Sequence, residues 1–542
     1  MTALDAAGAP CSRALLGVLI ALGSAFGRPA LAQTAPEQPT AQTDAVPAAA
    51  DTTGGGATPA EPALPPTRPW SIVPSVTMQE SVTDNVWLAP TQRQADLISA
   101  VTPDLAVSGQ TRRLTLSLDA NLTYDKYLSA TALDGIQYAV NGYGNAELVD
   151  KLLYLDMRSA IDVQPLMLTG PISAESRVLP TNQAEVINNS ISPYLRHDFG
   201  DWASGELRYT LATINYANAG AGMPVAPANS IEALNNLSNA VTNEYTVGLH
   251  SGPTFGRVNW GVDGDYSQAS YSAQRQIDQS TETTTLEYDF IHEFGVIGKV
   301  GYDGYRDSAF PTTDTSNPSW RLGFRLTPGP RSSLTFEAGS RFGGPYWAGK
   351  LYYKFSPTLR LDASHDIAQV TQQALMTMAL TSLVPNNLGQ LVSPITGLPT
   401  SPNQQLFSYI APSFLQKTSR MTISGQRGLT TVVFGVTYQE NDIGTASLAQ
   451  GAMETQSVLE SDLSVTYQLN RHSDIRFGGS TSRLFDTIHI QEATIGQATL
   501  SYDYKLSPSL TGSLAYSYYT MSNKLATSYY ENIFMISLRK AF

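Results

Sequence analysis

The clearest pattern in the chain is a strict alternation of apolar and polar residues from Leu114 to Asp125, written LTLSLDANLTYD. Each apolar position is followed by a polar one, which is a period of two residues. Successive side chains of a β-strand point to opposite faces of the sheet, so this period places all the apolar side chains on one face. The stretch therefore predicts a strand with one apolar and one polar surface.

Weaker copies of this pattern continue to the C-terminus. The clearest are Leu152–Val163, Trp202–Tyr216, Val258–Tyr266, Thr283–Phe290, Gly295–Tyr302, Trp320–Leu326, Leu334–Arg341, Trp347–Phe355, Leu359–Asp366, Leu429–Tyr438, Ser457–Leu469, Thr494–Leu506, Leu510–Tyr519 and Tyr529–Phe542. A tilted strand needs roughly 9–11 residues to cross a bilayer. We expect residues 69–542 to form an all-β, antiparallel, up-and-down transmembrane β-barrel of about 22 strands, within a range of about 18–24.

The connections between these segments alternate in length. Short ones are built from turn residues, as in Pro328-Gly329-Pro330. The long ones are Asp84–Ala95, Gln164–Glu185, Ala217–Ala240, Gln268–Ser280, Asp307–Asn317, Thr371–Pro412 and Asp442–Glu454. Gly343-Gly344-Pro345 is an exception, a tight turn on the side of the long connections. This asymmetry is typical of barrels in the outer membrane of Gram-negative bacteria, whereas a soluble β-sandwich, the alternative, does not need it.

The N-terminal region predicts export. Arg13 precedes the apolar run Ala14–Phe26, and Ala30-Leu31-Ala32 follows as a cleavage site, so residues 1–32 predict a signal peptide. A membrane anchor is the alternative, but the run is shorter than the roughly 20 residues that a spanning helix needs. Residues 33–68 are rich in Ala, Pro, Thr and Gly and predict a disordered periplasmic linker, or alternatively a docking arm for a partner. An even number of strands would place both termini in the periplasm.

The last segment carries a feature of its own. Phe534, Ile536, Leu538 and the terminal Phe542 share one face of the predicted strand. A terminal aromatic residue on an alternating strand resembles the signal by which the barrel-assembly machinery recognises outer-membrane proteins. We therefore expect that machinery, and outer-membrane lipid, as partners.

If the apolar face meets lipid, the alternation assigns charged residues to the lumen. The acidic ones form one predicted wall: Asp119, Asp125, Asp156, Asp162, Asp263, Asp265, Glu287 and Asp289. The basic ones form a second: Arg321, Arg325, Arg341, Lys350, Lys354 and Arg360. Facing walls of opposite sign would order water in a wet pore and favour polar solutes such as sugars. The alternative is that these charges only neutralise one another. Thr371–Pro412 is the candidate for a constricting loop.

Other function classes find little support. The chain has a formal net charge of -13 and lacks the basic excess that nucleic-acid binding requires. It contains none of the common hydrolase, metalloprotease or phosphate-loop motifs, so we expect no enzyme activity and no catalytic, metal or cofactor site. The single cysteine, Cys11, lies in the predicted leader. A siderophore-type transporter would need a folded plug before the barrel, which the composition of residues 33–68 does not predict.

The first predicted hairpin resembles a known family. Thr83-Asp84-Asn85-Val86, followed by Asp96-Leu97-Ile98 and Pro103, is similar to the opening of the beta-barrel porin 2 family, and Leu118 to Tyr127 continues the likeness. That family includes outer-membrane proteins associated with exopolysaccharide loci and PEP-CTERM sorting systems. Read from the residues alone, Thr83-Asp84-Asn85 predicts a strand end followed by an Asx-type turn, with sugar binding as the alternative.

Three functions remain open at this stage. The resemblance implies exopolysaccharide export, with a polysaccharide and periplasmic export components as partners. The lumen chemistry suits a diffusion porin for small polar solutes equally well. A structural barrel that docks a periplasmic partner through residues 33–68 is the third. The acidic net charge argues against a pore specialised for polyanions.

Overall fold

The computed structural model describes residues 70–165, 173, 183–217, 239–272, 275–308, 314–371, 384–385, 391–392, 413–443, 454–486, 493–523 and 528–542. The expected signal peptide and linker, and almost all of the expected constricting loop, lie outside these residues. Within the described part of the chain, no helix is long and apolar enough to cross a membrane.

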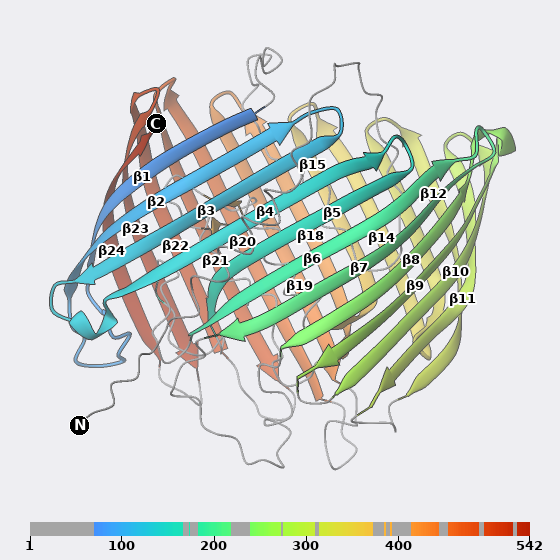
Figure 1. The fold of residues 1–542 in the computed structure, drawn as a ribbon, viewed down its shortest axis with the longest axis horizontal. Helices are drawn as coiled ribbons and strands as arrows, with labels where there is room; N and C mark the ends of the chain where they lie inside the picture. The colour runs from blue at the N-terminus through green and yellow to red at the C-terminus, as the bar shows by residue number, and fades with distance from the viewer. Residues whose placement is uncertain are drawn as a thin grey trace, which may run out of the picture. The chain divides into compact units, whose positions relative to one another are not determined.

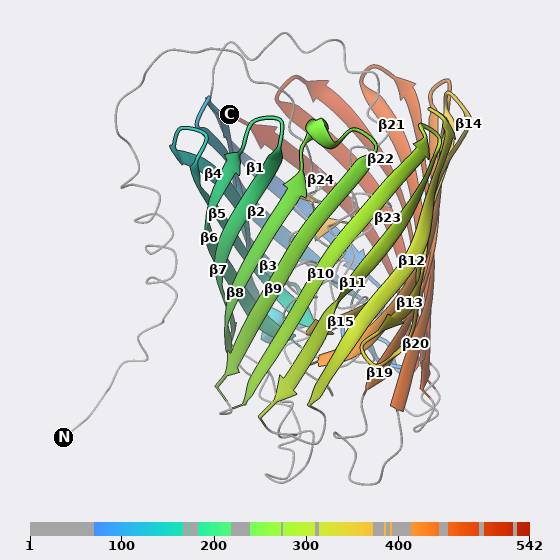
Figure 2. The same cartoon turned by 90° about the vertical axis from the view of Figure 1, so that its right-hand side faces the viewer.

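Twenty-two strands form one closed antiparallel β-barrel, which confirms the predicted fold and strand number (Figures 1 and 2). They are β1 (Trp70–Thr83), β2 (Asp96–Gln110), β3 (Leu114–Tyr127), β4 (Gly135–Val149), β5 (Leu153–Pro165), β6 (Gln183–Asp198), β7 (Ala203–Ala217), β8 (Ala240–Ser251), β9 (Val258–Tyr271), β10 (Gln276–Ile291), β11 (Phe294–Asp307), β12 (Thr315–Gly329), β13 (Ser332–Arg341), β14 (Gly344–Ser356), β15 (Leu359–Thr371), β18 (Ser413–Arg427), β19 (Thr430–Ile443), β20 (Glu454–Asn470), β21 (Ser473–Asp486), β22 (Ala493–Ser507), β23 (Leu510–Asn523) and β24 (Tyr529–Ala541).

Each barrel strand pairs with its neighbours along the chain, and β24 pairs with β1 to close the sheet. Two further strands of two residues each, β16 (Val384–Pro385) and β17 (Leu391–Val392), pair only with one another. The closing pairs run from Ser75 opposite Ala541 to Thr83 opposite Ile533. Trp70 and the C-terminus therefore lie at the same end of the barrel, the end of the short turns.

The convex face of the barrel is apolar through the middle of the strands. Val300 and Leu322 are each 61% exposed, and Ile536 on β24 is 51% exposed. Neighbours along each strand point to the concave face, and several are polar, such as Arg321 beside Leu322 and Ser537 beside Ile536. A sheet that exposes its large apolar side chains and turns its charges inward is suited to a lipid surround rather than to water.

Aromatic side chains border this apolar band on the short-turn side. Tyr288, Phe290 and Phe294 form a row with ring centroids 4.9 and 6.0 Å apart. Trp202 and Trp260 meet nearby, with centroids 5.8 Å apart. On the other side of the band the convex face carries further aromatic rings: Tyr209, Tyr245, Trp320 and Trp347. Aromatic rings prefer the boundary between hydrocarbon and water, so these two girdles mark the edges of a membrane-sized band.

The strands extend past this band at the ends that lead into the long connections, and there the two faces exchange character. On β10, Gln276 and Asp278 lie on the convex face, while Ile277 between them is 1% exposed on the concave face. Predicted strands such as Thr283–Phe290, Gly295–Tyr302 and Trp320–Leu326 were therefore too short. The alternating pattern requires apolar residues on the convex face, whereas the strand ends that lead into the long connections carry apolar residues on the concave face.

The inward apolar residues gather into three buried clusters. The first joins β5–β10 with β15 and β18: Ala160, Val186, Ile214, Ala240, Ala269, Tyr271, Ile277, Val370 and Phe414. The second contains Leu88, Tyr529 and Met535, the last of which lies in the middle of β24. The third contains Tyr127. Toward the long connections the barrel interior is thus buried, and it carries these apolar clusters together with buried charged groups such as Asp307. Toward the short turns it is polar and open to water, since Thr115 and Ser117 are exposed there.

Most of the predicted connections agree with the strand ends. Asp84–Ala95 and Thr371–Pro412 match the gaps between strands to within a residue. Gln268–Ser280 was wrong as a long connection, because β9 continues to Tyr271 and β10 begins at Gln276. The tight turn between β13 and β14 is confirmed, and Phe342 and Gly343 adopt positive φ angles of 53° and 78°. A two-residue hairpin with both angles positive matches the twist of its strands.

Candidate functional site: the concave face of the barrel

All the residues of the two predicted walls lie at concave-face positions of their strands. On β3, Leu122 and Tyr124 are exposed on the convex face while Asp125 is buried on the other side. The same alternation turns Asp119, Asp156, Asp162, Asp263, Asp265, Glu287 and Asp289 inward, and likewise Arg321, Arg325, Arg341, Lys350, Lys354 and Arg360.

Neighbouring members of the two predicted walls form ion pairs on β10–β13. Arg325 Nε donates to Glu287 Oε1 at 2.6 Å, and its Nη2 donates to Asp289. Glu337 accepts from Lys299 Nζ at 3.0 Å and lies 3.7 Å from Arg321 Nη1. Here the acidic and basic groups neutralise each other on strands one or two positions apart in the sheet, which is the alternative considered above, rather than facing each other across the lumen.

The same column of ion pairs continues toward the long connections, where it is more deeply buried. Arg341 Nη2 lies 3.0 Å from Asp303 Oδ1, and Arg275 Nε donates to Asp307 Oδ1 at 3.0 Å. Sequence reasoning missed Arg275, Asp303 and Asp307, because it ended the strands before them. Continuing the parity of Lys299 to the end of β11 would have found both aspartates, Asp303 and Asp307.

A second mixed group occupies β4–β7. Tyr154 and Tyr194 stack with centroids 5.0 Å apart, and the guanidinium of Arg208 lies 3.9 Å from the centroid of Tyr194. Arg208 also pairs with Glu206 at 2.9 Å and with Asp156 at 3.6 Å. Of the predicted wall residues, only Asp156 belongs to this group. The rings and charges together form a rigid polar surface on one side of the lumen.

On β8 and β9, two more residues of the predicted acidic wall have partners. His250 Nε2 lies 3.2 Å from Asp263 Oδ1, and Thr246 Oγ1 donates to Asp265 Oδ2 at 3.2 Å. In the described residues, no group of three or more His, Cys, Asp or Glu side chains is arranged to hold a metal ion.

Two cations on β14 differ from Arg325 and Arg341. Lys350 and Lys354 lie on the concave face of β14, and no acceptor among the described residues forms an ion pair or hydrogen bond with either. Lys350 is exposed inside the barrel. Lys354 stands directly opposite Arg360 of β15, which pairs with Asp362 at 3.2 Å.

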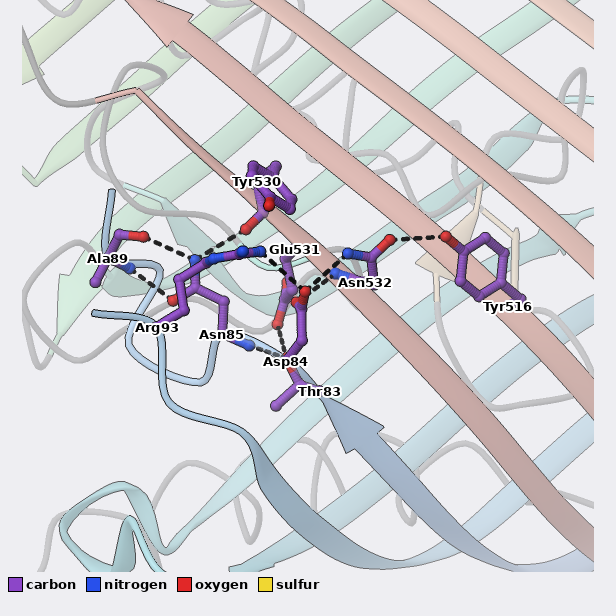
Figure 3. A network of polar contacts seen from close by, with 9 residues as sticks. All are labelled: Thr83, Asp84, Asn85, Ala89, Arg93, Tyr516, Tyr530, Glu531 and Asn532. Atoms are coloured by element: carbon purple, nitrogen blue, oxygen red, sulfur yellow. Dashed lines mark hydrogen bonds and ion pairs between the residues drawn. The ribbon is translucent and has the colours of Figure 1, made fainter. Parts of the chain in front are cut away.

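The Thr83-Asp84-Asn85 motif lies at the seam between β1 and β24 (Figure 3). Thr83 Oγ1 donates to Glu531 Oε1 at 2.7 Å. Asp84 accepts from the backbone and the side-chain amide of Asn532, both at 2.8 Å. The motif therefore uses its polar side chains within the protein, in agreement with the structural role read from the sequence.

Asn85 extends this seam network into the β1–β2 connection. It is fully buried, and its amide donates to the carbonyl oxygens of Ala89 and Tyr530, both at 2.9 Å, while Ala89 N donates back at 2.8 Å. Arg93 closes the network by pairing with Asp84 at 3.1 Å and covering the ring of Tyr530 at 4.0 Å (Figure 3). These contacts fold the connection back over the seam.

The next connection is held in a similar way. In the loop between β3 and β4, Asp134 accepts a hydrogen bond from the Lys126 ammonium and another from the Tyr127 backbone at 2.8 Å. Both bonds favour the carboxylate and lower the pKa of Asp134.

The residues of the predicted assembly signal lie together on the convex face of the last strand. Phe534, Ile536 and Leu538 are 48%, 51% and 44% exposed, and Phe542 follows the strand with its backbone N donating to Pro74 O at 2.9 Å. Recognition by the assembly machinery stays a prediction.

In comparisons with known proteins, solved structures resemble the fold of this chain, whereas family models and curated sequences do not match it. No family model and no curated protein matches the chain, so the resemblance to the beta-barrel porin 2 family stays a prediction. The siderophore receptor PirA from Acinetobacter baumannii is 9% identical, with 86% of this chain and 80% of that chain covered and a TM-score of 0.46. The FrpB iron transporter from Neisseria meningitidis is 10% identical, with coverage of 88% and 82% and a TM-score of 0.48. The Ferric-Catecholate import receptor Fiu from E. coli K12 is 12% identical, with coverage of 87% and 82% and a TM-score of 0.46. The fold of this chain does not depend on these likenesses, because its own strand pairing defines the barrel.

Proposed function

We propose that this chain is an outer-membrane β-barrel that provides a passage for hydrophilic material. The observation that carries the proposal is the opposite polarity of the two faces through the middle of the strands. The convex face there exposes Val300 and Leu322, while the concave face carries Lys299, Arg321 and Glu337. An apolar exterior suits lipid, and a polar interior of this strand number is too wide for its own side chains to fill.

The further proposal is that the material is an exopolysaccharide on its way out of the cell. The resemblance of the Thr83-Asp84-Asn85 opening to the beta-barrel porin 2 family supports this role. The buried apolar clusters around Ile277 and Phe414 support it over a wide diffusion porin, because an apolar wall narrows the part of the lumen that water fills. Export of a single polymer strand needs only a narrow passage.

Deletion of the gene tests the role in cells. We expect loss of the secreted polymer with unchanged uptake of small sugars, and restoration of the polymer by the full-length chain. Normal polymer with slower sugar uptake would contradict export and favour a diffusion porin. If a chain lacking only residues 33–68 reproduces the whole deletion phenotype although the barrel assembles, a docking role replaces both.

A further inference from the structure

The concave face of β14 and β15 carries positive charge that the protein does not neutralise. Other lumen-facing cations, such as Arg325 and Arg341, contact carboxylates two strands away in the sheet. Lys350 and Lys354 have no such contact in the described part of the chain. Among the described residues, no ion pair within the barrel accounts for their position.

The strand register makes this arrangement unfavourable for the empty barrel. Lys354 and Arg360 are directly opposite on neighbouring strands and on the same face. Like charges in directly opposite positions of an antiparallel pair destabilise the sheet. Within the described residues, Asp362 offsets part of this charge through its ion pair with Arg360.

We infer that Lys350, Lys354 and Arg360 form a binding strip for the anionic groups of a hydrophilic polymer in the lumen. This inference rests on the proposal that the concave face is a passage. Lys350 and Lys354 are four residues apart on one strand face, which separates them by about 13 Å along the strand. One small anion cannot span that distance, whereas a polymer with repeated carboxylate or sulfate groups can contact both.

Tyr352 lies between the two lysines on the same face and is only partly buried. An aromatic ring between cations provides a surface for the apolar side of a sugar ring, while the lysines contact its charged substituents. The strip lies on the part of β14 that approaches the short turns, where the interior is polar and open to water. A polymer that comes from the short-turn side would meet it before the buried apolar clusters.

Equilibrium binding to the purified full-length barrel tests the strip. The probes are fluorescent dextran sulfate and unsulfated dextran of the same length. We expect dextran sulfate to bind at least ten-fold more tightly than dextran, and its binding to weaken with added salt because the charges are screened. The triple variant Lys350→Gln, Lys354→Gln, Arg360→Gln should lose most of this preference.

A matched control removes the same number of positive charges from the same end of the barrel. It combines Arg112→Gln, Arg113→Gln and Lys540→Gln, which lie in the β2–β3 turn and on the convex face of β24. This control should bind dextran sulfate as the natural chain does. Equal losses in the two triple variants, or equal binding of dextran and dextran sulfate, would overturn the inference. If the strip triple variant does not fold, Lys350→Gln alone provides the same comparison.

The experiment separates this inference from the proposed passage. A barrel that conducts ions but does not discriminate dextran sulfate from dextran contradicts the strip alone. A barrel that binds dextran sulfate through these residues but never conducts contradicts the passage alone, and the strip is then an anion-binding surface without transport.

Discussion

Single residues at the seam hold the first strand to the last. Asp84 and Asn532 are far apart in the chain, yet they share three hydrogen bonds across the β1–β24 boundary, and Asn85 fixes the adjoining connection. A closed barrel has no free edges only as long as this pair of strands stays together. The Thr83-Asp84-Asn85 motif therefore serves to close the barrel, and its polar side chains bind within the protein rather than to a ligand.

We predict that Asn85→Ala destabilises the barrel by about 1–3 kcal/mol, because it leaves a buried backbone N–H and two carbonyl groups without partners. Urea unfolding in lipid vesicles measures the change. Asn259→Ala is the control, since the Asn259 side chain is exposed and forms no hydrogen bond with a described residue. Equal stability of the two variants would contradict a stabilising role of the seam network.

The buried ion pairs of the column make a second prediction at this scale. Arg341→Met leaves the Asp303 carboxylate buried without its cation and should cost about 3–5 kcal/mol of stability. Adding Asp303→Asn to that variant removes the stranded charge and should restore most of the loss. The same urea titration measures both variants. A double variant no more stable than the single one would show that the pair matters through packing rather than charge.

At the scale of strands, the convex side chains define where the barrel meets its surroundings. Leu322 lies in the middle of the apolar part of β12, and Ser316 lies on the same face near the end of that strand. The pattern of exposure predicts that lipid covers the first position and water the second. Substitutions at the two positions should therefore differ in cost.

Leu322→Arg should destabilise the barrel in lipid by about 2–4 kcal/mol, the cost of a cation on the lipid face near the midplane. Ser316→Arg should change stability by no more than about 0.5 kcal/mol, as exposed substitutions usually do. Unfolding of each variant from vesicles gives the two values. Equal costs at both positions would contradict the placement of the membrane band.

The sequence was sufficient for the strands and their faces, because the alternation that identifies them is local. It placed Leu122, Leu322 and Phe534 on the convex face and fixed the ends of the connection 84–95. It failed where the faces exchange character, as at Ile277. It also paired no charges, because partners such as Arg325 and Glu287 lie 38 residues apart and meet only through the strand register.

At the scale of the whole molecule, the polarity and burial of the barrel interior change along the barrel axis. The short-turn half is polar, charged and open to water around Thr115, Ser117 and Lys350, and the other half holds buried apolar clusters. The net charge of -13 does not describe this distribution, since the strip on β14 and β15 is locally basic. Local charge decides what an interior surface binds, and the argument from net charge against polyanions is therefore weak.

The most direct test of the central claim is the single-channel conductance of the refolded barrel, residues 33–542, before and after a charged thiol reagent. Residues 33–542 contain no cysteine, so one can be introduced at Lys350 on the concave face or at Leu322 on the convex face. We predict that an anionic methanethiosulfonate changes the conductance of Lys350→Cys in discrete steps and leaves Leu322→Cys unchanged. Conductance that responds equally at both positions, or the absence of any channel from either variant, would contradict a hydrated passage through this barrel.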